Sequence, residues 1–382
     1  MDMELDEEHR MLRDNVRAFA ESEIRPKAAA YDRSRQFPLP EFHKAAQLGL
    51  TGVMVPEEWG GSAMDSLAYV LVIEEISRVD ASLGVILSVN NSLYCHPISK
   101  FGTPEQKKKW LAPFARGEKL GCYCLTEPDA GSDAGSLRTS ARREKDRWIL
   151  NGSKVFVTNG LAADAGIVYA KTDPAAPSSK GISAFIVDVK NSQGCSKGKS
   201  ETKMGITSSG SVEIVFENCA VPAENLLGEV DQGFKIALHT LDGGRIGIAA
   251  QALGIAQGAF DEAVRYARER KQFGVPISQH QAIQFYLADM ATEIDAARLL
   301  TYRAARVKDT QERYTLEASM AKLYASEVAN KVAYKAVQIF GGYGYINEYP
   351  VERYFRDARI CELYEGTSEV QRLVISGQIL RG

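Results

Sequence analysis

The spacing of apolar residues changes twice along this chain, and this change limits the folds that the chain can adopt. Apolar residues recur every three or four positions up to about residue 120, alternate with polar residues from about 121 to 228, and recur at helical spacing again after Gly233. The first spacing places apolar side chains on one face of a helix, whereas alternation places them on one face of a strand. Because neither pattern suits the other structure, the sequence predicts three units of different class.

The predicted architecture is a multidomain α+β protein in which a β unit lies between two helical units. We expect an N-terminal all-α domain at residues 1–120, a middle β-barrel or β-sandwich domain at 121–228, and a C-terminal four-helix-bundle domain at 229–382. The length fits this division, because 382 residues at roughly 150 residues per domain suggest two or three domains.

Three local signals predict where elements begin and end. Pro26 is expected to end the first helical run, and Thr103-Pro104-Glu105 is expected to begin a helix with Thr103 as its cap. Asn151-Gly152 lies between two β-type runs, and this dipeptide is the strongest short-range signal for a hairpin turn.

The charge balance and the first residues exclude several classes of protein. The 46 Lys and Arg residues nearly balance the 49 Asp and Glu residues, so we expect no nucleic-acid partner. No apolar run is long enough for a membrane span. The acidic start differs from a secretory signal or a transit peptide, so we expect a bacterial cytoplasmic protein, or a processed protein of the mitochondrial matrix. The cysteines and histidines are scattered, so neither a disulfide framework nor a metal site is expected.

Four polar or glycine-rich regions are expected in loops, where binding groups are concentrated. They are YCLTEPDAGSDAG from Tyr123, FVTNG from Phe156, LDGGR from Leu241, and the C-terminal pair QIFGGYGY and LYEGTSE. Each also has a purely structural interpretation, as a turn-rich loop, a helix cap, a helix end or a solvated acid. Phosphate-loop, HExxH and GxSxG motifs are absent from the sequence, and composition alone does not decide between the interpretations.

Taken together, these segments resemble the flavin-dependent acyl-CoA dehydrogenases, and the pattern is closest to the short-chain (butyryl-CoA) branch. LTEPDAGSD, NGSKVFVTNG, RKQFG, QIFGGYGY and YEGTSE occur in the order and spacing of that family, from the first helix to the last. The resemblance implies FAD as cofactor. It also implies oxidation of an acyl-CoA to a trans-2-enoyl-CoA, by loss of an α proton and transfer of a β hydride to flavin N5, with electrons passed to electron-transferring flavoprotein.

The resemblance implies that Glu365 is the base that takes the α proton. A carboxylate suits this task when water is excluded, because burial raises its basicity. The backbone N–H of Glu365 is implied to bind the thioester oxygen, and Gly366 leaves room for the thioester. The isovaleryl and long-chain branches place their base in the segment that matches LDGGR. The matching position here is Gly244, which cannot act as a base, so the comparison favours Glu365 and a short- or medium-chain enzyme.

The resemblance also assigns residues to the flavin. Phe156 stands where many relatives have a tryptophan beside the flavin ring, so the aromatic face is kept and the indole N–H is lost. Arg270 is implied to pair with the cofactor pyrophosphate of a neighbouring subunit, which implies a homodimer and, usually, a homotetramer built as a dimer of dimers. The implied FAD contacts are Tyr123, Leu125, Thr126, Gly131, Ser132, Phe156, Val157, Thr158, Arg270, Gln281, Gln338, Ile339, Phe340, Gly341, Gly342, Thr367, Ser368 and Glu369.

The substrate contacts implied by the resemblance lie in three of the same segments. Arg245 suits the anionic or carbonyl groups of CoA. The complete implied set is Ser132, Asp242, Gly243, Gly244, Arg245, Tyr364 and Gly366.

Three other functions stay open at this point. The substrate could be a branched short-chain or a medium-chain acyl-CoA. The same fold could carry oxidase chemistry, or the decarboxylation of a dicarboxylyl-CoA. A flavin-free binding protein is the third alternative, and it would be expected to lack the base or the flavin loops, both of which are present.

Overall fold

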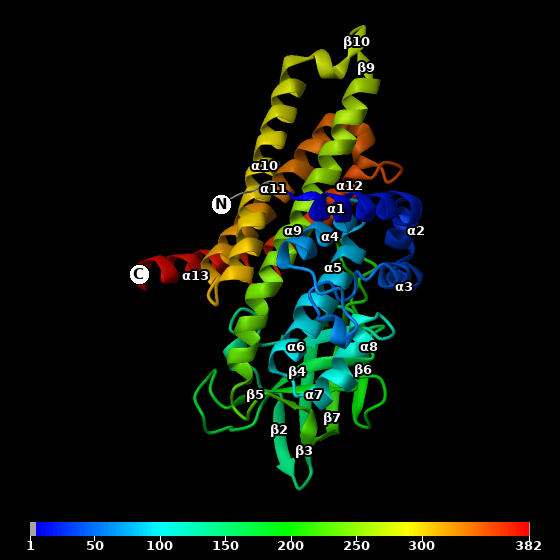
Figure 1. Cartoon of the computed structure of the whole chain (residues 1–382). Helices are drawn as coiled ribbons and strands as arrows, with labels where there is room; N and C mark the ends of the chain where they lie inside the picture. The colour runs from blue at the N-terminus through cyan, green and yellow to red at the C-terminus, as the bar shows by residue number, and fades with distance from the viewer. Residues whose placement is uncertain (1–4, 382) are drawn as a thin grey trace.

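The computed structural model describes residues 5–381, and it confirms the predicted order of a helical, a β and a second helical unit. Figure 1 shows the β unit at one end of the molecule and long helices that run to the other end. Residues 1–4 and 382, which the predicted terminal domains include, lie outside the described residues. The domain limits after residues 120 and 228 stay predictions. None of the helices within residues 5–381 is long and apolar enough to cross a bilayer.

The N-terminal unit contains short helices, and α4 is one of those that are buried along their whole length. Every residue of α4 (Ser66–Ser77) is buried, which explains why its apolar residues do not keep to one face. Thr103 caps helix α7 through a capping box with Gln106, as predicted. The other elements of the unit are α1 (Glu7–Phe19), η1 (Ala20–Ile24), α2 (Arg25–Ser34), α3 (Leu39–Gln47), η2 (Glu57–Trp59), α5 (Ala81–Ser88), η3 (Val89–Cys95), α6 (His96–Phe101), α7 (Pro104–Gln106), η4 (Lys107–Leu111) and α8 (Ala112–Ala115).

The prediction that Pro26 ends the first helical run is wrong. The run continues through the π-helical turn η1 into α2, which ends at Ser34. Within this wider turn the N–H of Arg25 bonds to the carbonyl of Ala20, five residues back. Pro26 then lies in the first turn of α2, where a missing N–H is tolerated.

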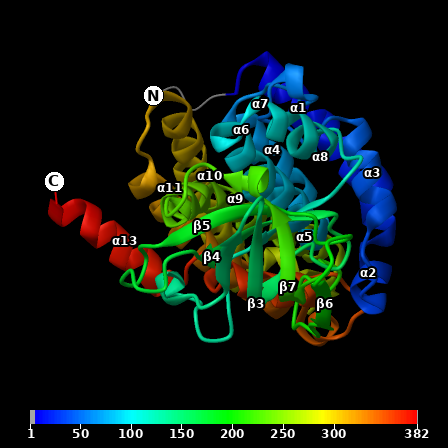
Figure 2. The same cartoon turned by 90° about the horizontal axis from the view of Figure 1, so that it is seen from below.

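The middle unit is one eight-stranded sheet with the strand order β6-β7-β3-β2-β4-β5-β8, and β1 pairs with β4. Figure 2 looks onto this unit. Its core includes the buried residues of β4 and β5. The strands are β1 (Gly121–Cys124), β2 (Ser140–Glu144), β3 (Arg147–Val157), β4 (Ala165–Lys171), β5 (Ile182–Val187), β6 (Cys195–Ser200), β7 (Val212–Pro222) and β8 (Leu226–Leu227), with η5 (Ala134–Ser136) and η6 (Ala223–Asn225) between them.

Asn151-Gly152 does not form a hairpin turn, so this prediction is also wrong. Both residues lie inside β3, opposite a bulge in β7, and the Asn151 side chain accepts a hydrogen bond from the N–H of Asn218 at 2.8 Å. Gly152 is needed because a Cβ there would lie 2.5 Å from Oγ1 of Thr139. The hairpin turn of this region is Lys145-Asp146, which joins β2 to β3.

The C-terminal unit is a helical bundle centred on α9 (Gly233–Glu269), which extends from the β unit to the far tip of the molecule (Figure 1). The LDGGR segment was expected in a loop or at a helix start, but Asp242 to Arg245 lie inside α9. The helix continues through the two adjacent glycines, Gly243 and Gly244. Both glycines are buried, and this tertiary packing outweighs their low helix propensity. The remaining elements are β9 (Lys271–Gln272), β10 (Val275–Pro276), η7 (Ile277–Gln279), α10 (Gln281–Thr310), α11 (Thr315–Phe340), η8 (Gly341–Tyr345), α12 (Val351–Ala358), η9 (Arg359–Glu362) and α13 (Ser368–Arg381).

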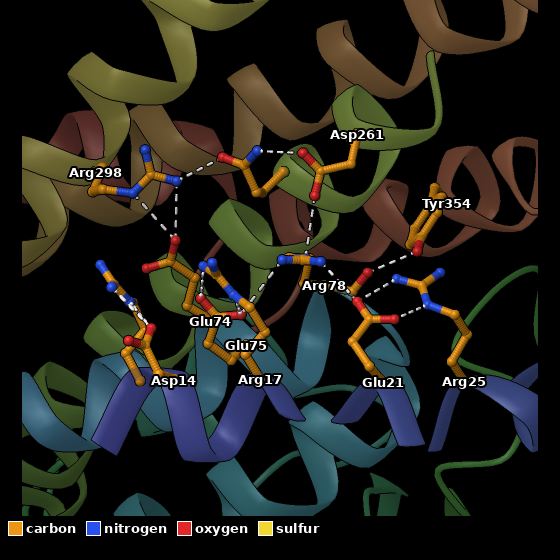
Figure 3. A network of polar contacts seen from close by, with 12 residues as sticks. Asp14, Arg17, Glu21, Arg25, Glu74, Glu75, Arg78, Asp261, Arg298 and Tyr354 are labelled. Carbon is orange, nitrogen blue, oxygen red and sulfur yellow. Dashed lines mark hydrogen bonds and ion pairs between the residues drawn. The ribbon is translucent and has the colours of Figure 1, made fainter. Parts of the chain in front are cut away.

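A network of ion pairs joins the N-terminal helices to this bundle (Figure 3). Glu74 on α4 is buried, and its carboxylate accepts hydrogen bonds from Arg298 at 3.0 Å and from the hydroxyl of Tyr302 at 3.0 Å, both on α10. Arg78, which follows α4, pairs with Asp261 of α9 at 3.2 Å and with Glu21 at 2.7 Å. Burial raises the pKa of Glu74, and Arg298 opposes this effect. The network therefore fixes α4 against α9 and α10.

We predict that Arg298→Met lowers the free energy of unfolding by about 3 kcal/mol, because it leaves the buried Glu74 carboxylate without its cation. Arg303→Met is the matched control on the same helix, since Arg303 forms an exposed pair with Glu317 and should change stability by less than about 1 kcal/mol. Urea titration of the two variants measures both values. Equal effects would show that the Glu74 pair does not join the two units.

Candidate active site

The segment between η9 and α13 carries Glu365 on a strained turn. Glu365 and Gly366 both have left-handed backbone angles, with φ of 52° and 91°. The carbonyl of Gly366 accepts hydrogen bonds from Nζ of Lys322 at 2.7 Å and from Nε2 of Gln371 at 2.9 Å. Gln371 also donates to the carbonyl of Glu365 at 3.1 Å. These bonds from α11 and α13 hold a backbone conformation that a glutamate seldom adopts.

The carboxylate of Glu365 points at α9. A Cβ built on Gly244 would lie only 2.0 Å from Oε2 of Glu365 and 2.8 Å from Leu93, which belongs to η3. Glu365 as a whole is half-buried, but its Oε2 atom is inaccessible to solvent and has no hydrogen-bond partner among the described residues. Burial raises the pKa of Glu365 from 4.5 to about 7, although Lys322 and Arg245 act in the opposite direction. The site therefore holds a carboxylate that can take up or release a proton near neutral pH.

The same face of α9 continues beyond the carboxylate with two further polar contacts. One turn after Gly244, a Cβ on Gly247 would lie 2.2 Å from the hydroxyl of Tyr69, which is bonded to Ser88 at 2.8 Å. One more turn along, Gln251 accepts a hydrogen bond from the hydroxyl of Tyr364. Tyr69 and Gln251 are both buried, so they close this side of the site.

On the β unit, the two predicted flavin segments lie side by side. The N–H of Val155 donates to the carbonyl of Thr126 at 2.9 Å, which joins the loop after β1 to the end of β3. A bulge in β3 lies between Lys154 and Val157, and there Phe156 has a left-handed backbone with φ of 57°. The bulge turns the Phe156 ring outward, so that 66% of the residue is exposed. An exposed aromatic ring on this surface can cover one face of a flat ligand.

A buried ion pair that sequence reasoning missed holds these two segments together. Lys154 is fully buried, and its Nζ donates to Glu127 at 2.6 Å and to the carbonyl of Leu125 at 3.1 Å. The Glu127 carboxylate also accepts from the N–H groups of Arg138 and Thr139. Glu127 lies within the motif LTEPDAGSD and Lys154 within NGSKVFVTNG. A lysine among the apolar residues of a β-type run is the sequence signal that could have revealed this ion pair.

The predicted CoA segment is buried in the bundle. Arg245 donates to Asp242 at 2.7 Å, while its Nε atom is buried and has no partner among residues 5–381. Asp242 also accepts from Thr315. Gly243 faces the hydroxyl of Tyr314, which is likewise buried without a partner in the described chain. Buried hydrogen-bond donors that find no partner in the described chain are suited to bind the polar groups of a ligand.

Five of the predicted flavin residues of the C-terminal unit form a second group at the other end of the molecule. Arg270, Ile339, Phe340, Gly341 and Gly342 line a pocket of about 440 Å³ at the tip that carries β9 and β10. In Figure 1 this tip lies at the end opposite the sheet that carries Thr126 and Phe156. Gln281 and Gln338 are near this tip in sequence but do not line the pocket. Within one chain, the structure does not bring the two groups together.

The other predicted flavin residues differ in their exposure. Tyr123 is half-buried, Leu125 and Val157 are buried, and Gly131 and Ser132 are exposed. At the start of α13, the hydroxyl of Thr367 accepts from the N–H of Val370 at 3.3 Å, Ser368 is buried and Glu369 is exposed.

A buried carboxylate whose pKa is raised to about 7 is the kind of group that enzymes use in acid–base chemistry. Three family descriptions cover the chain in order: acyl-CoA dehydrogenase N-terminal domain at residues 6–118, middle domain at 122–219 and C-terminal domain at 231–380. The chain therefore belongs to the acyl-CoA dehydrogenase family and is an oxidoreductase.

Individual relatives resemble the chain over its whole length. It is 54% identical over 379 residues to the mitochondrial short-chain specific acyl-CoA dehydrogenase of Mus musculus, covering 99% of this chain and 92% of that protein. The solved structure of butyryl-CoA dehydrogenase from Megasphaera elsdenii matches with a TM-score of 0.97, 46% identity and 100% of both chains covered. A chain in a solved structure described as the electron transferring flavoprotein of Acidaminococcus fermentans matches with a TM-score of 0.98 and 50% identity, again over 100% of both chains.

We predict that Gly244→Ala lowers acyl-CoA dehydrogenase activity about a hundredfold, because the added methyl group takes the place of the Glu365 carboxylate. Gly377→Ala on α13 is the control, since a Cβ there meets nothing within 4 Å. Steady-state turnover and circular dichroism of both variants separate loss of activity from loss of fold. Wild-type turnover in a folded Gly244→Ala protein would contradict the placement of the carboxylate.

Proposed function

We propose that this chain is an FAD-dependent dehydrogenase of short-chain acyl-CoA thioesters of the butyryl-CoA type, and that Glu365 is its catalytic base. The observation that carries the proposal is the Glu365 carboxylate, whose Oε2 atom is shielded from water and has no hydrogen-bond partner in the described part of the chain, and whose pKa is raised to about 7. A base of this kind can remove a weakly acidic α proton at neutral pH. The product is the trans-2-enoyl-CoA.

In this proposal the chain's own groups bind and orient the thioester and take one proton. Oε2 of Glu365 takes the α proton, and the N–H of Glu365, which belongs to the left-handed turn, donates to the thioester oxygen and so acidifies the α carbon. Arg245 and Tyr314 offer unpartnered donors to the polar part of the CoA arm. FAD, when bound, accepts the β hydrogen with its electron pair.

The residues present fit an FAD shared between two subunits. The exposed Phe156 ring, with Thr126 and Thr158, suits the flavin ring. Arg270 and the two glycines at the bundle tip suit the pyrophosphate, because Cβ atoms on Gly341 and Gly342 would meet nothing within 4 Å and the backbone is open to a ligand. Since the two groups lie at opposite ends of one chain, we propose that the tip of one subunit completes the flavin site of its partner.

Helix α13 supports the proposed assembly into a homodimer or homotetramer. It projects from the body of the molecule in both views (Figures 1 and 2). Leu373 and Leu380 on this helix are 71% and 84% exposed. Apolar side chains in such a position are typical of a surface that another subunit covers. Electron-transferring flavoprotein is the proposed electron acceptor, and the similar chain in the solved structure described by that name supports it.

The short-chain preference has two supports. The similar proteins include a short-chain specific acyl-CoA dehydrogenase that is 54% identical to this chain. In addition, the buried side chains of Tyr69 and Gln251 fill the space along α9 beyond the carboxylate. A long acyl chain that followed this face would have to displace both.

We predict that Glu365→Gln lowers the rate of flavin reduction by butyryl-CoA by about 10²- to 10⁴-fold, because the amide cannot accept the α proton. The variant should retain FAD and still bind butyryl-CoA, as followed by anaerobic absorbance. In the wild-type protein, the rate should rise as the pH increases through about 7, because a base is active only when deprotonated.

Glu312→Gln is the matched control for this substitution. Glu312 is exposed on the link between α10 and α11 and should leave the rate unchanged. Near-native flavin reduction in Glu365→Gln would remove Glu365 from the role of base.

A second prediction concerns chain length. In a series of straight-chain acyl-CoA esters from C4 to C16, kcat/KM should be highest at C4 and should fall about tenfold or more by C8, because Tyr69 and Gln251 limit the depth of the site. A maximum at C8 or longer would contradict the short-chain assignment while leaving the dehydrogenase reaction intact.

A further inference from the structure

Lys322 on α11 is a buried cation that the proposed mechanism does not use. The residue is fully buried in the bundle. Its Nζ lies 2.7 Å from the carbonyl of Gly366, and among residues 5–381 no carboxylate lies within ion-pair distance of it. Burial lowers the pKa of Lys322 to about 8, so the amine is mostly protonated at neutral pH. Burying an ammonium group without a carboxylate partner costs free energy of folding. The position of Lys322 therefore needs a structural or functional reason.

The position of Lys322 relative to Glu365 offers that reason. Its hydrogen-bond acceptor is the residue that directly follows the base, and this residue is in the left-handed conformation. Gln371 donates to the same carbonyl, but it is neutral. Lys322 is also the cation that most opposes the effect of burial on Glu365, ahead of Arg245.

We propose that Lys322 is a positioning residue that fixes the Gly366 carbonyl and, through its positive charge, stabilises the deprotonated form of Glu365. This inference rests on the proposed role of Glu365 as the base. It assigns two separable effects to one side chain. The hydrogen bond holds the turn, and the charge keeps the base ionised in a site where burial alone would favour the neutral acid.

Among the titratable groups around Glu365, Lys322 is the charged group whose effect on the base the experiment tests. Arg245 approaches from α9 but already pairs with Asp242. Tyr69 from α4, Tyr123 from β1 and Tyr364 from the same turn have pKa values raised by burial, so they stay neutral near pH 7.

Further from the base, Glu362 acts on Lys322 itself and favours its protonated form. Cys361 is buried and its pKa is raised, so it stays neutral near pH 7 and adds no charge beside Lys322. Gly244, which contacts the carboxylate, carries no charge.

The test is the pH dependence of flavin reduction by butyryl-CoA in single-turnover experiments. Removal of the charge raises the pKa of Glu365, so the acid limb of the profile should move to higher pH by about one unit in Lys322→Met. The rate should therefore fall much more at pH 6 than at pH 9. Lys322→Arg keeps the charge and should leave the limb close to its wild-type position.

Three further variants separate charge, hydrogen bonding and general damage. Gln371→Leu removes the neutral donor to the same carbonyl, and it should lower the rate without moving the limb. Lys322→Gln retains a donor without the charge, so it should move the limb even if Lys322→Met fails to fold. Lys331→Met, at an exposed position of α11, should match the wild-type protein. Visible absorbance gives the FAD content of each variant.

The outcomes distinguish this inference from the proposed function. An unchanged acid limb in a folded Lys322→Met or Lys322→Gln protein overturns the inference, provided that Glu365→Gln is inactive. If Glu365→Gln is active, Glu365 is not the base, and the inference about Lys322, which rests on that role, is overturned with it. A shifted limb in the two uncharged variants, together with an unshifted limb in Lys322→Arg and Gln371→Leu, supports the role of the charge.

Discussion

The burial of one unpartnered carboxylate is the constraint on which the rest of this structure depends. Oε2 of Glu365 is inaccessible to solvent and lies against Gly244, where a single methyl group would displace it. A carboxylate in such a place is destabilised unless other charges support it. Lys322 and Arg245 supply that support, and a strained turn held by Gln371 keeps the carboxylate directed at α9. Precise packing between helices is therefore required before any chemistry can occur.

The arrangement of the units meets this requirement. Helix α9 carries Gly244 and runs the length of the molecule, α11 supplies Lys322, and α4 supplies Tyr69 from the N-terminal unit. The ion pairs of Glu74 and Arg78 fix α4 against the bundle, so the distance between Tyr69 and α9 is set by buried charges as well as by apolar packing (Figure 3). The β unit contributes a different surface, on which the Lys154 ion pair holds two loops together. Base and flavin surface are thus built separately.

The sequence predicted the order of units and the main motifs because both depend on local patterns. It failed where tertiary contacts decide the outcome. Asn151-Gly152 has strong turn propensity, but the pairing of β3 with β7 keeps it extended. Pro26 is accommodated by a π-helical turn, and the segment CSKGKS forms strand β6 although its residues do not alternate between apolar and polar. Glu365 could be named from its motif, whereas its contact with Gly244 and the nearby Lys322 are more than forty residues distant in sequence and required the fold.

The pKa of Glu365 tests the account most directly. Glutamate labelled with carbon-13 at the carboxyl group can be titrated by NMR in the intact protein, and comparison with Glu365→Gln identifies the signal of Glu365. The account predicts a midpoint near pH 7, because burial outweighs the two nearby cations. A midpoint near 4.5, the ordinary value for glutamate, would show that the carboxylate is solvated and would contradict the central claim.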